Sequence, residues 1–448
     1  MADATGLQFT LSLAGIPGLA VVDFTHREAL SAPFTLTLTV ASRDPDLGPA
    51  DVLERNATLV VWEDGEPLRH LHGVVSEFGR GDRGHRRTFY TLVIRPALWR
   101  LDLRHNARIF QDVPPQDILA TLCAERGLTD VAFALTREPE AREYCVQYRE
   151  SDLAFVERLA AEEGLVYFHE FEPAVGGTHR LIFADAPTLL PHLGARTYHG
   201  RAGGTPPRRH VRKLTQVSRV RPAAVTLKDY TFKQPAYDQR HEHPAPDLGE
   251  HAQRDDYEHY DYPGRYKAAA SGVPFTRVRL EALRAEANTA QAESDLPELA
   301  PGSRFTLTDH DIAALNRDWQ VIAVVHHGEQ PQALEEDGGD GRTRYFNELV
   351  LAPADRAWRP APPVRPRVDG PQVAFVVGPE GEEIHCDEHG RVKVQFPWDR
   401  YAEPDDTASC WIRVSQDWAG GGYGSMAIPR IGHEVVVSFL EGDPDQPL

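Results

Sequence analysis

Residues 390–400 read GRVKVQFPWDR, and residues 410–448 read CWIRVSQDWAGGGYGSMAIPRIGHEVVVSFLEGDPDQPL. Apolar and polar side chains alternate in both stretches, as at Val392, Val394 and Phe396, and this period of two is typical of strands with one buried face. Glycine and Asp-Pro turns separate the strands. Several short strands within residues 372–448 therefore predict a small Greek-key barrel of the OB type.

The segment before this module, residues 357–371, is rich in proline and contains WRPAPPVRPRVDGP. Proline-rich segments are stiff and extended, so we interpret this one as a linker. The N-terminal part, residues 1–104, again shows the strand pattern, with Phe34, Leu36 and Leu38 alternating with threonines. Regular turns between such strands predict a first β-barrel there.

Residues 105–205 carry two helix signals and are expected to form an α+β subdomain. One helix is predicted to begin at the Pro114-Pro115 pair, because proline is favourable in the first helical turn. The second is predicted to begin after Ser151, a good N-cap, and to end at Gly164. Both helices show apolar residues at helical spacing.

The remaining segments are expected to build a second β-barrel interrupted by an insertion. Residues 206–236 and 300–356 carry strand patterns, whereas residues 237–299 begin with a polar stretch rich in His, Asp and Tyr. A helix rich in Ala and Glu is predicted at about residues 277–293. The fold class is therefore mainly β with α+β insertions, and the double barrel precedes the OB-type module.

The composition excludes several classes of function. The net charge of −19 disfavours nucleic acid and anionic membranes as partners. The N-terminus has no basic and apolar segments of a Sec signal, and no stretch approaches the roughly 18 apolar residues that a stable membrane anchor needs. The four cysteines form no C-x-x-C pair, so a reducing compartment is expected.

Four residue groups could suggest chemistry, and each also has a plain structural interpretation. The group His385 to His389 could hold a metal, but it lies at a turn; the histidines around 241–243, with His251 and His259, lie in the polar insertion. Carboxylates at 162–163, 170 and 172 could form a glycosidase pair, but they also suit a helix end and a strand edge. Trp398, Trp411 and Trp418 could line a sugar groove, or they could pack the small barrel and its contact with a neighbouring subunit. We therefore expect no catalytic, cofactor-binding or metal-ligating residues, and no enzyme.

The two stretches quoted first resemble the spike-base barrel of the VgrG family, the spike proteins of type VI secretion systems. Residues 95–119 (RPALWRLDLRHNARIFQDVPPQDIL) and 148–168 (YRESDLAFVERLAAEEGLVYF) resemble the hub portion of the same family. The motif positions, which we expect to be structural, are Tyr148, Arg149, Glu150, Asp152, Gly164, Phe396, Trp398, Asp399, Trp411, Arg413, Gly424, Pro429, Arg430, Gly432, Glu434, Gly442, Asp443 and Pro444.

This resemblance implies a homotrimeric, cell-puncturing hub and spike, similar to the hub of contractile phage tails. It implies that the trimer caps a hexameric tube of Hcp type, contacts baseplate components and delivers effectors into target cells. A tip protein, effectors and adaptor chaperones would act through a C-terminal needle, which we expect to be missing from a C-terminally truncated chain. Assembly in the bacterial cytoplasm would precede injection by the type VI apparatus. The alternatives are a phage tail hub or baseplate spike, or a spike with a lytic or toxin domain farther downstream.

Overall fold

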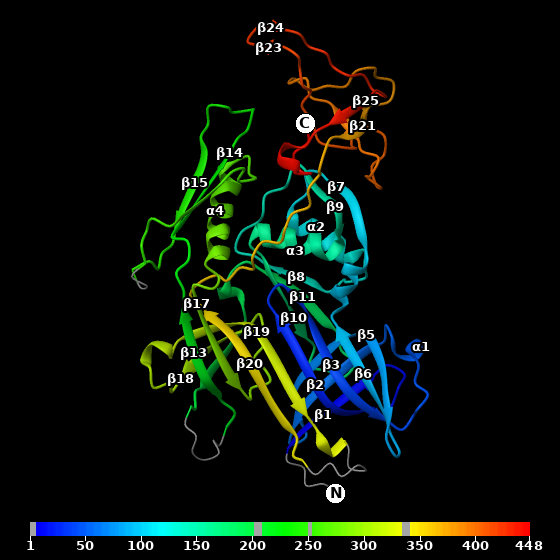
Figure 1. Ribbon diagram of the computed structural model, residues 1–448, viewed down its shortest axis with the longest axis vertical. Helices are drawn as coiled ribbons and strands as arrows, with labels where there is room; N and C mark the ends of the chain where they lie inside the picture. The colour runs from blue at the N-terminus through cyan, green and yellow to red at the C-terminus, as the bar shows by residue number, and fades with distance from the viewer. Residues whose placement is uncertain (1–5, 201–207, 250–252, 334–340) are drawn as a thin grey trace. The chain divides into compact units, whose positions relative to one another are not determined.

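The computed structural model describes residues 6–200, 208–249, 253–333 and 341–448 (Figure 1). The chain divides into two compact units. Unit 1 contains Met1–Trp99, Leu128–Glu138 and Ala161–Ala361, and unit 2 contains Arg100–Gly127, Pro139–Ala160 and Pro362–Leu448. None of the helices in the described part of the chain combines the length and the hydropathy that a bilayer span requires.

The first half of the large sheet in unit 1 curls into a barrel. Its strands pair in the order β1-β4-β5-β6-β3-β2, all antiparallel. They are β1 (Leu7–Leu13), β2 (Ala20–Ala29), β3 (Ala32–Ser42), β4 (Asn56–Glu63), β5 (Glu66–Arg83) and β6 (Thr88–Arg95). The inward positions of the alternating pattern, such as Leu36, Leu38 and Val40, are fully buried in one apolar core. The alternation of apolar and polar residues in the sequence therefore predicted these core residues correctly.

One side chain closes this first barrel between β1 and β2. The amide of Gln330 accepts a hydrogen bond from the Phe9 backbone N–H at 2.7 Å, and its Nε2 donates to the carbonyl oxygens of Phe9 and Val21 at 3.3 and 3.1 Å. Gln330 therefore supplies to the edge of β1 the partners that a neighbouring strand would otherwise supply.

Truncating this side chain should open the edge of β1. In Gln330→Ala we expect a loss of about 1–3 kcal/mol of stability, because the buried Phe9 backbone groups lose their partners. Hydrogen exchange should accelerate at Phe9 but not at Thr10, which is in register with Val60 and whose backbone groups point to the other side of β1, towards β4. Exchange at Phe9 that stayed as slow as in the wild type would contradict this account of closure.

The second half of the sheet forms another closed ring. Its strands are β12 (His192–Thr197), β13 (Val211–Ser218), β17 (Asn288–Ser294), β18 (Arg304–Thr308), β19 (Asp318–Glu329) and β20 (Arg344–Pro353). They pair in the order β12-β18-β19-β20-β17-β13. A parallel bridge between Tyr198 and Val211 joins the end of the β12 segment to β13. Trp319 and Phe305 are fully buried in the core of this second barrel.

The two barrels share a seam where β2 pairs with β19, in register from Ala29↔Ala323 to Asp23↔Glu329. β19 also pairs with β18 and β20, so it belongs to the seam and to the second barrel. Figure 1 shows β19 beside β2 and β20. The prediction of a mainly β, double-barrel fold is confirmed.

Two smaller sheets complete unit 1. One contains β8 (Val131–Ala134), β10 (Val166–Phe171) and β11 (His179–Ala184); the other contains β14 (Ala224–Asp229), β15 (Gln239–Pro244) and β16 (Glu258–Asp261), with helix α4 (Ala269–Leu283) packed on it. Short helices lie at α1 (Pro49–Val52), η2 (Pro187–Leu189) and η3 (Ala313–Leu315).

The helix predicted at about residues 277–293 is wrong in position. α4 ends at Leu283, and residues 288–294 are strand β17, in which Ala290 and Ala292 are buried. The alanine-rich composition favours helix locally, but pairing of β17 with β13 and β20 overrides this preference. The prediction also began too late, because α4 begins at Ala269 and contains Pro274 inside the helix.

Unit 2 combines a small α+β part with the C-terminal module. The α+β part contains β7 (His105–Phe110), α2 (Pro115–Ala124), β9 (Cys145–Ser151) and most of α3 (Asp152–Glu163). Both helix predictions are confirmed, including the N-cap, because the hydroxyl of Ser151 accepts from the Ala154 N–H at 3.1 Å. The short helix η1 (Ala97–Leu103) precedes β7.

The C-terminal module contains a three-stranded sheet in the order β22 (Lys393–Gln395), β21 (Gln372–Val377) and β25 (Glu434–Val437). A hairpin, β23 (Ala419–Gly420) with β24 (Tyr423–Gly424), and the turn η5 (Leu440–Gly442) complete it. Phe396, Val394 and Ala374 are buried in its core. Beyond the turn at 442–445, residue Leu448 pairs with Ser438 through two backbone hydrogen bonds of 2.9 and 2.7 Å.

Candidate functional site

The hub motif around Tyr148 and the C-terminal module meet inside unit 2. Tyr148 on β9 accepts a hydrogen bond from Gln372 Nε2 at 2.6 Å, and its ring packs edge-on against Trp398, with centroids 5.4 Å apart. Trp398 Nε1 in turn donates to Gln372 Oε1 at 2.7 Å. The single amide of Gln372 therefore satisfies both polar aromatic side chains.

A second set of contacts extends this junction along β7. The Tyr401 hydroxyl accepts from Arg104 and from Asn106 Nδ2, and the Arg108 guanidinium lies over its ring at 5.3 Å. Gln111 Nε2 donates to the Thr407 carbonyl at 2.5 Å. Residues near 401–407 are thereby held on β7 by hydrogen bonds and cation–π contact.

The turn after η5 fixes the other side of the junction. Asp445 Oδ1 accepts from the Val146 N–H of β9 at 2.7 Å. An apolar cluster fills the space between these contacts, and its members are Tyr144, Val146, Tyr148, Val368, Ile109, Trp398, Cys410 and Phe439. We call this set of contacts the hub–OB junction. It offers a mechanical connection between β9 and the C-terminal module.

The hub motif residues next to Tyr148 brace β9 from behind. Arg149 has a positive φ of 51° and is the extra residue of a β-bulge in β9, between the pairs Glu150–Asn106 and Tyr148–Ala107. Glu150 pairs with Arg158 at 2.6 Å, and Arg158 is only 2% exposed and also donates to the Val146 carbonyl at 3.1 Å. Asp152 accepts from Gln147 Nε2 at 2.8 Å. A charge network of this kind fixes the strand to which the C-terminal module is attached.

Gly164 lies in unit 1 at the end of α3, where its φ is +74°. A Cβ atom there would come within 2.5 Å of Val278, so both the conformation and the space require glycine.

The motif residues of the C-terminal module have separate roles. Phe396 is fully buried and stacks on Trp398, with centroids 5.0 Å apart. Burial raises the pKa of Asp399, which accepts from the Tyr401 N–H at 3.0 Å. Trp411 packs against His385 at 4.9 Å and beneath the Lys393 ammonium at 5.2 Å. These three positions contribute to the core of the module or to its junction with the hub.

The other motif positions shape turns and edges of this module. Gly432 donates its N–H to the Val376 carbonyl at 2.8 Å, and Arg430 pairs with Glu383 at 3.1 Å. Gly442 has a φ of +73°, and a Cβ there would lie 3.0 Å from the Val368 carbonyl oxygen. Asp443 and Pro444 are buried beside it. Gly424 and Glu434 are exposed, and Arg413 and Pro429 are half-buried.

The three tryptophans do not share one surface. Trp398 belongs to the hub–OB junction and Trp411 packs on His385, whereas Trp418 is 67% exposed and contacts Tyr423 of the β23–β24 hairpin at 5.9 Å. Trp418 therefore does not pack inside the barrel, and its expected place at a contact with a neighbouring subunit stays a prediction.

Loss of the Trp398 ring should loosen the hub–OB junction. We expect Trp398→Ala to cost about 3–5 kcal/mol, because it leaves a cavity and an unpaired Gln372 amide. Tyr148→Phe removes only one hydrogen bond and should cost about 1 kcal/mol. Limited proteolysis within residues 362–371 should be fastest in Trp398→Ala, slower in Tyr148→Phe and slowest in the wild type. Equal cleavage rates for both variants and the wild type would show that these contacts do not hold the module.

The other groups that the sequence singled out fall into structural settings. Asp387 bonds to Arg391 at 2.7 Å within its own turn, and Cys386 is exposed. His243 and His259 lie opposite Val225 on strands on either side of it, while His251 is outside the described residues.

The carboxylates proposed as a glycosidase pair are also separated by role. Glu163 pairs with Arg137 at 2.9 Å at the end of α3. Glu172 accepts from the Thr178 N–H at 2.9 Å in the turn between β10 and β11, and Glu170 is exposed on β10. Half-buried Glu162 lies on α3. The local contacts and exposure of these carboxylates match a helix end, a turn and a strand surface.

Sequence reasoning missed a buried polar cluster at the seam of the two barrels. His26 and Glu28 on β2 meet His326 on β19, with possible ligand atoms within 4.8 Å of one another. Arg69 Nη2 pairs with Glu28 Oε1 at 2.5 Å, and Arg69 Nη1 contacts His326 Nε2 at 2.7 Å. We call these four residues the seam cluster. The alternation in β2 carries a signal for it, because His26 and Glu28 occupy the same parity as buried Phe24.

The donor set of the seam cluster fits a guanidinium better than a metal ion. Two imidazoles and a carboxylate could ligate a transition metal. However, Arg69 already neutralises Glu28, and it also donates to the Pro297 carbonyl at 2.9 Å. A divalent ion beside this buried cation would leave the cluster with two uncompensated positive charges, which is costly away from water. We therefore assign the cationic role to Arg69.

The imidazole of His326 has three polar neighbours. Its Nε2 lies 2.7 Å from Arg69 Nη1 and 2.9 Å from Glu28 Oε1, and its Nδ1 lies 2.5 Å from the Tyr345 hydroxyl. Both ring nitrogens of His26 are buried without a hydrogen-bond partner among the described residues. Burial lowers the pKa of His26 to about 3 and that of His326 to about 4. Both rings are therefore neutral at pH 7.

Glu28 stays charged in this setting. Burial alone would raise the pKa of Glu28, but the adjacent Arg69 charge lowers it below its usual value. His169, behind Phe34 at 5.3 Å, is also neutral, because burial lowers its pKa to about 3. The seam cluster therefore contains one ion pair and two neutral histidines, and a third neutral histidine, His169, lies on β10 behind Phe34.

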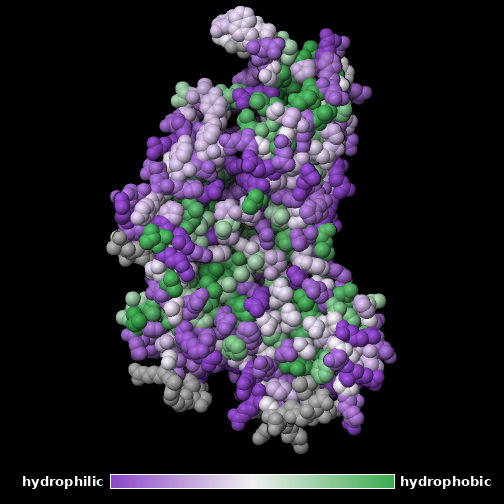
Figure 2. Space-filling view, in the orientation of Figure 1, coloured by the Kyte–Doolittle hydropathy of each residue, from purple (hydrophilic) through white to green (hydrophobic). Residues whose placement is uncertain are grey.

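Unit 2 also exposes an apolar stripe on its small sheet. Val373 on β21 lies opposite Val436 on β25, and Phe375 shares their face, while the intervening Ala374 is buried. In Figure 2, hydrophobic side chains gather over the region where Figure 1 labels β21 and β25. Exposed, adjoining apolar side chains of this kind mark protein contact surfaces.

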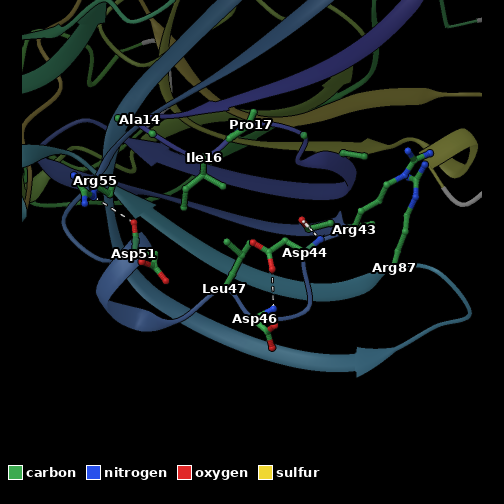
Figure 3. A pocket seen from close by; sticks show the side chains of 15 residues that line it. Ala14, Ile16, Pro17, Arg43, Asp44, Asp46, Leu47, Asp51, Arg55 and Arg87 are labelled. Atoms are coloured by element: carbon green, nitrogen blue, oxygen red, sulfur yellow. Dashed lines mark hydrogen bonds between the residues drawn. The ribbon is translucent and has the colours of Figure 1, made fainter.

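An open hollow of about 770 Å³ lies at one end of the first barrel. Figure 3 shows Arg43 and Arg87 on one side of it and Asp46 and Asp51 nearer the other. Asp51 accepts from the Gly48 N–H at 3.0 Å. Its lining mixes charges of both signs with the Ile16-Pro17 loop, which suits a polar protein segment better than an apolar small molecule.

Comparison with known proteins supports a hub and spike relationship. A family described as "Phage tail baseplate hub (GPD)" matches residues 27–332, and one described as "Type VI secretion system/phage-baseplate injector OB domain" matches residues 382–448. Among solved structures, the Escherichia coli c3393 protein, described as a type VI secretion component similar to phage T4 gp27 and gp5, has a TM-score of 0.71 at 21% identity and 98% coverage of both chains. A Neisseria meningitidis tail protein has a TM-score of 0.57 at 14% identity, covering 80% of this chain and 99% of its own. These two likenesses show the fold.

Curated relatives are much closer in sequence. The spike protein VgrG3 of Vibrio cholerae is 47% identical over 454 residues, which cover 99% of this chain and 44% of the relative. VgrG2b of Pseudomonas aeruginosa is 44% identical over 447 residues, covering 99% and 43%. The actin cross-linking toxin VgrG1 of Vibrio cholerae is 48% identical over 416 residues, covering 93% and 38%. The chain spans less than half the length of these three relatives. With its hub match over most of the sequence and its OB match at the C-terminal end, the chain belongs to the VgrG family of type VI secretion spike proteins.

Proposed function

We propose that this chain forms the structural hub and spike base of a type VI secretion system. In this role it assembles as a homotrimer, caps an Hcp-type hexameric tube and contacts baseplate components. The single observation that carries the proposal is the hub–OB junction, in which the hub motif at Tyr148 holds the spike-base module through Gln372 and Trp398. Such a part needs rigid connection and no catalytic pocket.

Partners beyond the tube follow from the same proposal. A tip protein, effectors and adaptor chaperones would be carried by segments that the longer relatives possess. The solved complex of a Francisella VgrG with PdpA supports partnership of such proteins with other secretion components. Assembly would take place in the bacterial cytoplasm, and the type VI apparatus would then inject the protein. The domain limits and the structural role of the motif positions given above belong to this proposal.

The mass of the protein in solution tests the proposal. The chain has a mass of 50.0 kDa, so light scattering over a concentration series should give about three times that value. A dimer at all concentrations would contradict a threefold hub. A monomer would show that segments outside this chain, or the tube, drive assembly, and would remove the claim that this part trimerises by itself.

We assign the apolar stripe on β21 and β25 to the contact between copies. Val436→Lys should shift the trimer towards monomer, because it places a charge in the middle of the stripe. Val364→Lys is the matched control, because Val364 is 95% exposed in the linker before the sheet. If both variants kept the wild-type mass, the stripe would not be the contact.

A second function is favoured by one observation, the relative described as an actin cross-linking toxin. A protein of this kind would carry an enzyme domain downstream of the hub and spike base, while the present chain itself would perform no catalysis. An actin cross-linking assay with the present 448-residue chain should therefore show no product. Cross-linked actin in that assay would contradict the non-enzymatic role of this part.

A further inference from the structure

The turn of the hairpin formed by β10 and β11 rests on the first barrel. The two strands pair in register along their length, and β10 lies against β3 and β5 (Figure 1). Near the turn, the rings of His169, Phe171 and His179 surround the buried ring of Phe34 on β3, with centroids 5.3, 5.5 and 6.2 Å away. We call residues 169–179 the hairpin tip.

Two hydrogen bonds join the hairpin tip to the barrel, and both use an imidazole. Nε2 of His72 on β5 donates to the Glu172 carbonyl at 2.8 Å. Nε2 of His179 accepts from the backbone N–H of Ala97, just after β6, at 3.1 Å. An N–H group can only donate, so this nitrogen of His179 carries no proton, and a protonated His179 would lose the bond.

His169 is the second imidazole that the closed hairpin tip keeps neutral. Its Nε2 is buried without a hydrogen-bond partner among the residues that the structure describes. Burial and the neighbouring His179 lower the pKa of His169 to about 3. The two rings lie 5.6 Å apart, so a proton on each would add repulsion between like charges. The closed tip therefore excludes protons from both imidazoles.

Charged groups on the barrel do not compensate a proton on His169. The barrel elements beside the hairpin tip carry His26, Glu28, Arg69, His70, His72 and Arg95. The Glu28 carboxylate attracts a proton to His169, but it pairs with Arg69 at 2.5 Å, and burial outweighs the attraction. Burial also lowers the pKa of His70, and Arg95 pairs with Glu77 at 3.0 Å.

Charged groups of the hairpin itself lie on its other face or in its turn. Glu170 and Arg180 stand opposite each other and are exposed, and Arg180 pairs with Asp130 at 2.7 Å. Glu172 accepts from the Thr178 N–H at 2.9 Å within the turn. These contacts stay within the hairpin and the segment before β8, so they do not hold the hairpin tip on the barrel.

Apolar contacts hold the other end of the hairpin. Val166, Phe168 and Ala184 are buried together with Leu30 and Ile322. The free energy of burying apolar surface does not depend on the charge of a histidine. Loss of the tip contacts would therefore leave the base of the hairpin in place.

We propose that the hairpin tip is an acid-sensitive latch, which is closed on Phe34 at neutral pH and separates from the first barrel when His169 and His179 take up protons. Opening gives both imidazoles access to water and breaks the bond from Ala97. It also uncovers the rings of Phe34 and Phe171, while the base of the hairpin stays attached. The latch lies within unit 1 and does not depend on the proposed trimer.

Hydrogen exchange of the full chain at pH 7 and pH 5 tests the latch. The Ala97 N–H is the reporter, because its hydrogen-bond partner, His179, lies on the hairpin tip. A histidine whose pKa rises from about 3 to near 6.5 on opening increases the opening equilibrium about 25-fold between these pH values. After correction for the intrinsic exchange rate, exchange at Ala97 should therefore accelerate at least about 25-fold. An unchanged rate would overturn the proposal.

The same experiment separates opening of the hairpin tip from unfolding of the barrel. Residues 90–94 of β6 pair with β3 and β5 inside the barrel. Their amides should exchange more slowly than Ala97 at both pH values, because only unfolding of the barrel exposes them. If Ala97 kept pace with these amides at both pH values, the tip would open only with the whole barrel, and the proposal would be overturned. This comparison uses the unsubstituted chain and does not depend on the folding of a variant.

A double substitution removes both titrating groups. His169→Phe keeps an aromatic ring against Phe34, and His179→Gln keeps an amide oxygen that can accept from the Ala97 N–H. In the double variant the acceleration of Ala97 exchange between pH 7 and pH 5 should fall below about threefold. His85→Phe, in the exposed loop between β5 and β6, is the control and should keep the full acceleration. Full acceleration in the double variant would also overturn the proposal.

Discussion

Acidification from pH 7 to pH 5 is expected to destabilise unit 1 strongly. His26, His169 and His326 are buried and neutral, and burial lowers their pKa values to about 3, 3 and 4. In the unfolded chain each would titrate near 6.5. Below about pH 6 unfolding therefore takes up as many as three protons, and the free energy of unfolding should fall by roughly 4 kcal/mol per pH unit.

The sign follows from which state holds the proton. A histidine whose pKa is lowered on folding contributes stability above the unfolded value near 6.5, and that stability is lost as the pH falls towards the folded value. Glu28 acts in a lower window, because its pKa is lowered on folding and its contribution declines only below the unfolded value near 4.5. Urea unfolding at pH 7, 6 and 5 should show the histidine effect first. A free energy of unfolding that did not change over this range would contradict neutral burial.

His26→Phe provides the matched test. His26 has no hydrogen-bond partner among the described residues and packs on Phe34 and His326, so phenylalanine removes one titrating group with little loss of contact. The slope of stability against pH should fall by about a third. Identical slopes in His26→Phe and the wild type would exclude His26 from the effect.

The second large effect is expected from Arg69→Met. This substitution leaves Glu28 buried between two imidazoles without its cation, and breaking a buried ion pair from one side costs about 3–5 kcal/mol. The carbonyl of Pro297 also loses its donor. Equilibrium unfolding in urea at pH 7.5 measures this loss while the histidines stay neutral.

The double variant Arg69→Met with Glu28→Gln separates charge from packing. Removing the orphaned carboxylate should restore about half or more of the lost stability, because the uncompensated charge is the main cost. Arg209→Met is the surface control, because Arg209 pairs with Glu63 at 2.7 Å in a partly exposed setting and should cost at most about 1 kcal/mol. Additive effects of the two seam substitutions would refute a coupled ion pair.

Local signals in the sequence predicted local structure well. Ser151 caps α3 and Gly164 ends it, because both features depend only on residues within one or two turns. Strand alternation likewise identified Leu36 and Leu38 as core residues. The motif at Tyr148 came from family resemblance, but its contact with Gln372 is not visible in the sequence, because 224 residues separate the two.

Where tertiary contacts override local preference, the sequence misleads. Residues 288–294 carry a composition typical of a helix, yet they pair on both sides within the second barrel. The seam cluster was missed because Glu28 and His326 lie 298 residues apart. The only sequence signal was that His26 and Glu28 occupy inward-facing positions in the alternation along β2. Alternation shows which face a side chain is on, but it does not show which residues it contacts.

β19 belongs to the second barrel and pairs along the seam with β2 of the first, and this has a mechanical consequence. A pull along its axis would load the hydrogen bonds to β2, β18 and β20 in parallel, as shear, so they would have to rupture together. Peeling one strand away at a time requires far less force than shearing several at once. Under axial load the two barrels should therefore unfold together. They should hold until the force is high enough to break these hydrogen bonds at once.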